Sequence, residues 1–146
     1  MSDFKYELGA DGVAVITWDV PEKSMNVMSL EGFALLDSLI DRALADDACR
    51  GIVITSAKPD FAGGMDLNVI AQMRAGGPQA IYDGVMQMHK VLRKIERAGM
   101  DPKTLKGGKP IATALPGTAL GIGLELPLST HRIFAAPNPK AKIGLP

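Results

Sequence analysis

"GIVITS", residues 51–56, is a short, continuously apolar stretch rich in β-branched residues. An unbroken apolar run of this length is typical of a strand that is buried on both faces. "VAVITW", residues 13–18, has the same character and predicts another strand. Between the two, after a possible Ser29 cap, apolar residues at helical spacing predict an amphipathic helix: Leu30, Phe33, Leu36, Ile40 and Leu44. Strand, helix and strand in succession indicate an α/β fold with a right-handed crossover.

The rest of the chain continues this pattern. Residues 79–97 carry a second apolar stripe at helical spacing, and "IATAL" (111–115) predicts a third buried strand. A further helix is expected over residues 120–130 and a further strand over residues 132–135. Residues 98–109, rich in glycine and lysine, indicate an exposed loop or insertion. A chain of 146 residues is expected to form about one domain.

Composition argues against several classes of function. Sixteen basic residues balance sixteen acidic ones, so a general attraction to nucleic acid is not expected. No apolar run reaches the roughly 18 residues that a membrane-spanning helix needs. The single cysteine, Cys49, cannot form an internal disulfide, and no signal or transit peptide is recognisable, which predicts a cytoplasmic location. No cysteine or carboxylate shares metal-ligand spacing with His89 or His131, so both are predicted to be structural and no metal is expected.

The first of two glycine-containing loops is "FAGGMDL", residues 61–67. Glycine permits positive φ and lets a ligand approach the main chain closely, and amides in such a turn can hold a negatively charged oxygen. An ordinary strand-to-helix turn in which Asp66 caps the helix explains the same residues. On the residue pattern alone, the ordinary turn is the favoured interpretation.

The second loop is "GTALGIGLEL", residues 117–126, with three glycines around the expected start of a helix and one isolated acid, Glu125. Glycines at a helix start offer free amides for an oxyanion. Buried among leucines, the carboxyl group of Glu125 would be desolvated and could exchange a proton near neutral pH. A solvated position on the polar face of the helix is the alternative, and the pattern does not decide between them. Two amides from separate loops and one carboxylate suit a reaction that forms an enolate from a thioester.

These stretches also resemble a known family. "SAKPDFAGGMDL" (56–67), "KPIATALPGTALGIGLELPLSTHRIFA" (109–135) and "AKIGLP" (141–146) follow the order and spacing of the enoyl-CoA hydratase (crotonase) superfamily, and "PEKSMNVMS" (21–29) resembles its N-terminal turn. Within this superfamily, the sequence most resembles the N-terminal hydratase portion of multifunctional fatty-acid oxidation proteins, in which a 3-hydroxyacyl-CoA dehydrogenase follows on the same chain. The resemblance implies a crotonase-like spiral of ββα units over residues 1–146, truncated before the C-terminal helices. It implies hydration of 2-trans-enoyl-CoA in fatty-acid β-oxidation.

The resemblance also implies roles for individual residues. The two oxyanion-hole amides correspond to Met65 and Ile122, although the isoleucine replaces a family glycine and resists positive φ. Glu125 corresponds to the first catalytic glutamate, which helps to activate the water that adds to C3. The second glutamate follows the family's Gly-Leu-Pro motif, here residues 144–146, so we expect a fragment that is crippled for hydration. Contacts with the CoA moiety are expected from Lys58, Ala62, Gly64, Asp66 and Gly121. By position alone, Lys58 is better explained as a solvated surface lysine.

An acyl-CoA thioester is therefore the implied substrate. The hydration step needs no cofactor, and NAD is implied only where a downstream dehydrogenase domain exists in the parent protein. A homo-oligomer, or association with the rest of an oxidation complex, is the implied assembly.

Three alternatives stay open. Enoyl-CoA isomerisation is one, although isomerases often lack a carboxylate at the position of Glu125. A dinucleotide-binding module is another, but the glycine spacing is not G-x-G-x-x-G. A non-catalytic folding or assembly piece is the third, because the second glutamate is missing.

Overall fold

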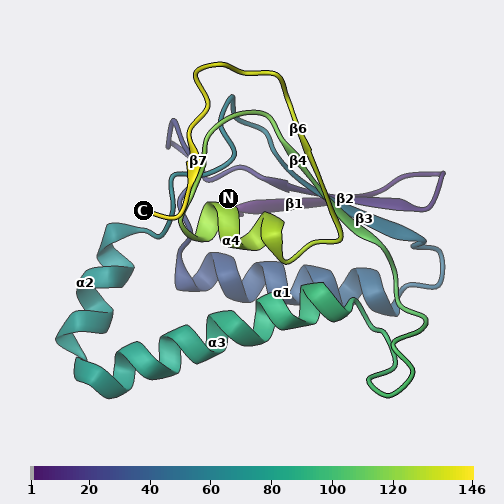
Figure 1. The fold of residues 1–146 in the computed structure, drawn as a ribbon, viewed down its shortest axis with the longest axis horizontal. Coiled ribbons are helices and arrows are strands. Elements are labelled where there is room, and N and C mark those ends of the chain that lie inside the picture. The colour runs from purple at the N-terminus through teal and green to yellow at the C-terminus, as the bar shows by residue number, and fades with distance from the viewer. Residues whose placement is uncertain (1) are drawn as a thin grey trace.

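The computed structural model describes residues 2–146, and its main sheet has five strands in the order β1-β2-β3-β4-β6 (Figure 1). These strands are β1 (Phe4–Leu8), β2 (Val13–Trp18), β3 (Gly51–Ser56), β4 (Ile111–Leu115) and β6 (Arg132–Ala135). β1 and β2 are antiparallel, and the remaining pairs are parallel. A second, two-stranded parallel sheet joins β5 (Ala119–Leu120) to β7 (Ile143–Gly144). The predicted α/β class and the predicted strands 13–18, 51–56, 111–115 and 132–135 are confirmed.

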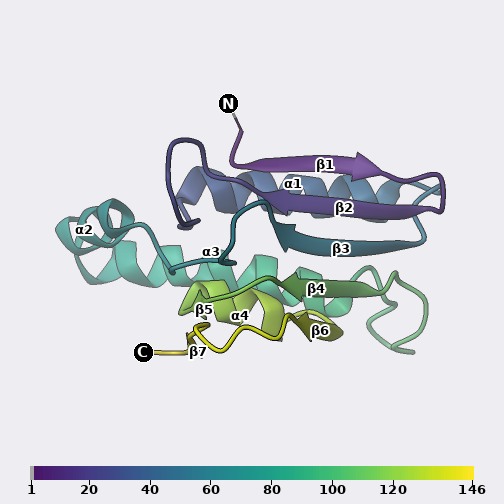
Figure 2. The same ribbon diagram turned by 90° about the horizontal axis from the view of Figure 1, so that it is seen from above.

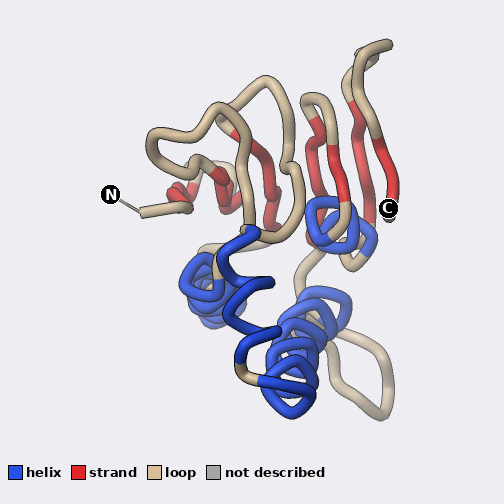
Figure 3. Tube along the Cα trace, turned by 90° about the vertical axis from the view of Figure 1, so that its left-hand side faces the viewer, coloured by secondary structure: helices blue, strands red, loops and turns tan. Residues whose placement is uncertain are grey.

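The helices are α1 (Leu30–Ala45), α2 (Leu67–Ala75), α3 (Gly77–Arg97) and α4 (Ile122–Leu128). All of them lie on one side of the main sheet, as the end-on view in Figure 3 shows. α2 and the N-terminal part of α3 extend beyond the strands, so they have no sheet to cover (Figure 2). Within residues 2–146, no helix is both long and apolar enough to span a membrane.

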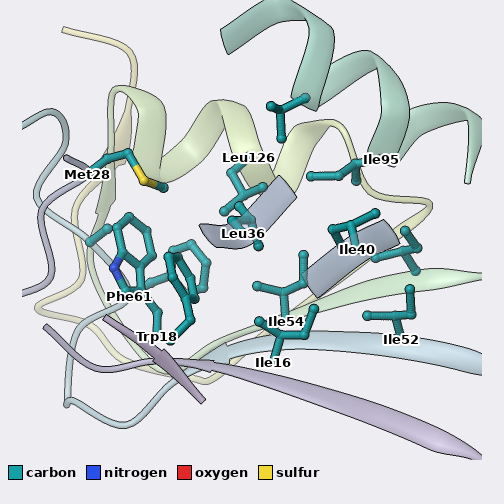
Figure 4. Close-up of a cluster of buried hydrophobic side chains, with 14 of the residues drawn as sticks. Ile16, Trp18, Met28, Leu36, Ile40, Ile52, Ile54, Phe61, Ile95 and Leu126 are labelled. Carbon is teal, nitrogen blue, oxygen red and sulfur yellow. The ribbon is translucent and has the colours of Figure 1, made fainter. Parts of the chain in front are cut away.

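The core fills the space between the sheet and the helices (Figure 4). It contains strand residues such as Ile16 and Ile54, Leu36 and Ile40 of α1, and Ile95 of α3. Trp18 stacks on Phe4 with ring centroids 5.3 Å apart and meets the edge of Phe61 at 5.6 Å. The hydroxyl of Ser29 accepts a hydrogen bond from the Gly32 N–H at 2.9 Å, which confirms the predicted cap of α1.

The opposite face of the sheet is only partly covered. In β3, Ile52 and Ile54 are buried, whereas Val53 and Thr55 on the other face are half-buried. The expected burial of this strand on both faces is therefore wrong. The physical reason is the placement of the helices, which all cover the face that Ile52 and Ile54 share.

Several elements were not expected from the sequence. β1, β5 and β7 have no counterpart in the predicted pattern, and α2 was expected only as the helix that Asp66 caps, without bounds. The helix expected over residues 120–130 is shorter and begins at Ile122. Residues 98–109 form an exposed loop with a bridge between Met100 and Gly107. At the end of this loop, the Lys109 ammonium donates to the carbonyl oxygens of Ala43 and Asp46 at 2.8 and 2.6 Å.

Candidate active site

The first glycine loop is held between two neighbouring segments. The N–H groups of Phe61 and Ala62 donate to Thr118 O, and that of Gly63 donates to Asn26 O. Met28 bonds to both neighbours of Met65: its N–H donates to Gly64 O, and its carbonyl accepts from the Asp66 N–H, each at 2.9 Å. The Met65 N–H points away from this bridge. It has no hydrogen-bond acceptor within residues 2–146.

The second loop ends in another free amide. Gly121 has φ +53°, a conformation that glycine adopts readily, and its N–H donates to Gly144 O at 3.0 Å. Its carbonyl accepts from the N–H groups of Leu124 and Glu125 and so begins α4. Ile122 and Gly123 therefore lie in the first turn, where amides lack partners inside the helix. Neither finds an acceptor elsewhere among the described residues. The positive φ falls on Gly121 and not on Ile122, so the isoleucine is compatible with this geometry.

The two loops contact each other directly. Leu120 N–H donates to Ala62 O at 3.1 Å, and Ala62 pairs with Ala119 in a parallel bridge. A Cβ atom added to Gly123 would lie 2.7 Å from the Ala62 Cβ, and one added to Gly121 would lie 3.9 Å from the Gly64 Cα. Only a hydrogen atom fits between α4 and the first loop at Gly123. The structure therefore brings the segments that carry Met65 and Ile122 together.

A cavity of about 280 Å³ lies beside these segments. Its lining residues are Met65, Val85, Met88, His89, Ile122 and Glu125. His89 and Glu125 also line an open groove of about 670 Å³ between α3 and α4. Met65 and Met88 also line an apolar pocket of about 250 Å³ that α2 and α3 form with Met73 and Ile81. These three spaces share lining residues and therefore adjoin. A ligand could extend from the open groove between α3 and α4 into the apolar pocket.

Glu125 is exposed, so of the two interpretations left open by the sequence, burial of its side chain among leucines is wrong. Ile122, Leu124 and Leu126 do pack into the core. Glu125 and Leu128 are three residues apart on a helix and share its outer side, so Glu125 faces the cavity and the groove. The alternative interpretation, a solvated residue on the polar face, describes its exposure correctly.

The expected CoA contacts lie around the first loop, but several are already engaged. Lys58 is not a solvated surface lysine: its side chain is 12% exposed, and its ammonium pairs with Asp19 at 3.2 Å. Both backbone groups of Ala62 are hydrogen-bonded, to Thr118 and Leu120. Asp66 caps α2 by accepting from the Asn68 N–H at 2.8 Å, as the ordinary-turn interpretation predicts. Asp66 also pairs with Lys23 at 2.9 Å. The Lys23 ammonium, and then the Asn68 N–H, lower the pKa of the Asp66 carboxyl group.

The two histidines have different environments. The His131 Nδ1 accepts from the Ile111 N–H at 2.9 Å, which leaves its other ring nitrogen to donate to Glu96 O at 2.9 Å. His131 therefore joins β4 to the end of α3, as a structural residue would. His89 instead is exposed and lines the cavity beside Glu125, so its structural role stays a prediction. The available signal was its place four residues after Val85, on the same side of α3.

Asn26 supports the first loop and was also missed. Its side chain is fully buried, accepts from the Val20 N–H at 2.9 Å and donates to Phe61 O at 3.0 Å. Further bonds reach Trp18 O and the Ser56 hydroxyl. An asparagine in a turn is too common to signal such a role in the sequence.

Known proteins share this arrangement, although no family model matches the chain. The fatty acid oxidation complex subunit alpha of Idiomarina loihiensis is 34% identical over 152 residues, which cover 98% of this chain and 19% of that protein. A solved enoyl-CoA hydratase from Thermoplasma volcanium has a TM-score of 0.82 at 28% identity, covering 100% of this chain and 52% of its own. An enoyl-CoA hydratase/isomerase from Xanthobacter autotrophicus has a TM-score of 0.80 at 26% identity, covering 99% and 49%.

The fold and these similarities define the class: the chain resembles the enoyl-CoA hydratase/isomerase (crotonase) family in sequence and shares the fold of its solved members. This confirms the family that the loop motifs resemble. The chain spans about half the length of the solved relatives and about a fifth of the curated one.

Proposed function

We propose that this chain carries the thioester-binding part of an enoyl-CoA hydratase, which adds water to 2-trans-enoyl-CoA in fatty-acid β-oxidation. The single observation that supports this proposal most is the pair of free amides, those of Met65 and Ile122, on two loops in contact. The loops border a cavity that also contains Glu125.

The chemistry of hydration matches these groups. As the oxygen of water adds to C3, negative charge develops on the thioester oxygen, and two fixed N–H donors stabilise that charge. The exposed carboxylate of Glu125 can accept the proton of the water. Lys58, Ala62, Gly64, Asp66 and Gly121 are the proposed surroundings of CoA. Lys58 would have to exchange Asp19 for a phosphate in order to bind it.

The oxidation-complex relative suggests the wider setting. We propose that the parent protein acts in the cytoplasm, as an oligomer or within an oxidation complex. A downstream dehydrogenase domain there would use NAD, whereas the hydration step needs no cofactor. Isomerisation of the double bond is the second candidate, because it uses the same two amides. The carboxylate of Glu125 favours hydration.

The test removes the N–H of one amide and keeps an apolar, although smaller, side chain. Proline is tolerated at the first position of a helix, where Ile122 lies, so Ile122→Pro deletes the N–H with little expected effect on α4. Crotonyl-CoA hydration is measured for the 146-residue chain and for the chain extended through the parent gene. In whichever form is active, we expect Ile122→Pro to slow hydration by about 100- to 1,000-fold.

Ile122→Val is the matched control, since it keeps the amide, and we expect it to retain most of the activity. Glu125→Gln should abolish hydration while leaving butyryl-CoA binding intact. Binding without hydration in the extended protein would indicate another enolate reaction. A failure of the extended protein to bind any acyl-CoA would contradict the proposal.

A further inference from the structure

The face of the main sheet that points away from the helices has no helix over it within residues 2–146 (Figure 3). Parallel strands usually have both of their faces covered, because they carry apolar side chains on both. On the outward face, the residues of the three inner strands are uncharged and half-buried: Val13, Val15, Thr17, Gly51, Val53, Thr55, Ala112 and Ala114. An uncharged face of this kind marks a surface at which another protein surface packs.

The two edge strands place opposite charges on the two sides of this face. One cross-strand row runs over it from β1 to β6 and consists of Glu7, Val15, Val53, Ala112 and Arg132. Glu7 and Arg132 are exposed, and neither forms an ion pair within residues 2–146. In the neighbouring row, Lys5 is already paired with Asp19 at 2.8 Å. The row therefore ends in one unpaired acid and one unpaired base, which the strand spacing sets roughly 19 Å apart.

A row of this kind is complementary to itself. When two copies face each other across a two-fold axis that runs along β3, Glu7 of each copy lies opposite Arg132 of the other. The same operation places Phe134, which is 63% exposed, opposite Lys5, and a cation can then approach the ring. The spacing and length of the strands give a face of about 20 Å by 20 Å, so about 400 Å² of each copy is buried, as in weak, reversible interfaces.

We propose that this face is an interface between two copies of the chain, with Val15 and Val53 at its centre and reciprocal Glu7–Arg132 ion pairs at its sides. Exposed ion pairs add little affinity, but they fix the orientation of the two copies, and like charges set opposite each other are costly. The face lies across the sheet from the helices that line the candidate site, so the interface leaves that site open (Figure 3).

The experiment measures association of the 146-residue chain by analytical ultracentrifugation over a wide range of concentration, with folding of each variant verified by circular dichroism. Because each single charge reversal creates two like-charge pairs, we expect Glu7→Arg and Arg132→Glu each to weaken dimerisation by about tenfold or more. The double variant restores opposite charges and should associate as the parent chain does. Lys90→Glu, a charge reversal at an exposed residue of α3, is the matched control and should leave association unchanged.

Cross-linking tests the geometry separately, because Val53 lies beside the two-fold axis and faces its own copy. Val53→Cys should be joined to the other copy by a short bifunctional maleimide, while the native Cys49 is buried. Ser38→Cys, at an exposed residue of α1 on the helical side, should not be joined.

A parent chain that stays monomeric at every concentration would overturn the inference, as would a double variant that associates no better than the single ones. Equal cross-linking through residues 38 and 53 would place the contact elsewhere and would overturn it too. The same measurements on the chain extended through the parent gene distinguish the remaining occupant. Loss of association and of cross-linking at residue 53 there would show that another segment covers the face, which would also contradict the inference.

Discussion

The two ends of α3 have the same apolar periodicity and opposite surroundings. At the C-terminal end, Val91 and Ile95 are buried, and the ammonium of Lys94 pairs with Asp37 and Asp41 of α1. At the N-terminal end, Ile81 and Tyr82 are 40% and 60% exposed, and the helix packs against α2 and lines the apolar pocket between them. One helix therefore contributes to the core at one end and lines the candidate site at the other. Stability and ligand binding should be separable along its length.

The comparison is tested most strongly by truncating one isoleucine at each end. Ile95→Ala removes a fully buried side chain, and we expect it to lower the free energy of unfolding by about 2–5 kcal/mol. Ile81→Ala should cost less than about 1 kcal/mol because its side chain is already partly in water. Urea unfolding of both variants measures the difference. Equal losses at the two positions would mean that the two ends of α3 are not distinct.

Asn26 connects the core to the first glycine loop, so its loss should affect both stability and ligand binding. Asn26→Leu keeps a similar volume but leaves the buried Phe61 O and Val20 N–H without their partner. We expect a loss of about 1–3 kcal/mol in unfolding free energy and weaker butyryl-CoA binding, since Phe61 begins the first loop. Asn26→Asp keeps the acceptor for the Val20 N–H but sets a buried carboxylate oxygen against the carbonyl oxygens of Trp18 and Phe61, so it should cost at least as much in unfolding experiments. Unchanged binding in Asn26→Leu would show that the loop does not depend on this side chain.

The cap of α1 belongs to the part of the molecule that forms the core. Ser29→Ala removes the acceptor of the Gly32 N–H, and we expect a loss of about 1 kcal/mol in unfolding free energy with no change in acyl-CoA affinity. Ser38→Ala on the same helix is the control, because Ser38 is exposed and bonds only to Leu35 O. Thermal unfolding of both variants measures the difference in stability. Equal effects of the two alanine substitutions would argue against a capping role for Ser29.

The smallest effect on stability is expected at the start of α2, the helix that packs against the exposed end of α3. The pKa of Asp66 is lowered in the folded state by Lys23 and by the Asn68 N–H, so its charge stabilises the fold above the ordinary carboxyl pKa. That contribution is lost as the pH falls through the lowered pKa. Asp66→Asn keeps a capping side chain but loses the charge, so it should be slightly less stable than the parent chain at neutral pH.

The difference between Asp66→Asn and the parent chain should disappear in strong acid, as melting temperatures over a pH series would reveal. Asp47→Asn, a change at an exposed turn residue, provides the control and should show no such trend. A difference that grows as the pH falls would contradict the assigned sign.

Patterns that extend over a whole element predicted the fold well. The β-branched run at residues 13–18 and the helical spacing of Phe33, Leu36 and Ile40 are local signals, and the structure matches both. β5 and β7 are two residues each and pair residues 119–120 with 143–144, so no local pattern reveals them. The start of α2 was anticipated by the Asp66 cap, but its extent was not predicted because only Val69 of its residues is buried, which leaves little apolar periodicity.

The candidate site was predicted as two loops, and the contact between those loops depends on the tertiary structure. The glycine at residue 123 was interpreted as part of a source of free amides, and only the tertiary structure identifies Ala62 as its close neighbour. The burial of Glu125 could not be decided from the sequence, because neighbours along a short helix point to different sides: Leu124 and Leu126 are buried and Glu125 is exposed. His89 reaches the cavity because α3 crosses beneath α4, which the sequence of α3 alone does not specify.

The close contact of Gly123 with Ala62 also bears on how such proteins can evolve. Because one methyl group and one hydrogen atom fill the space between the loops, neither position can grow without the other shrinking. Across descendants of this chain, positions 62 and 123 are therefore expected to vary together. A paired exchange, Ala62→Gly with Gly123→Ala, keeps the total volume, but the new Cβ would still lie 3.0 Å from the carbonyl oxygen of residue 62, so the spacing of the loops would have to widen slightly as both residues change.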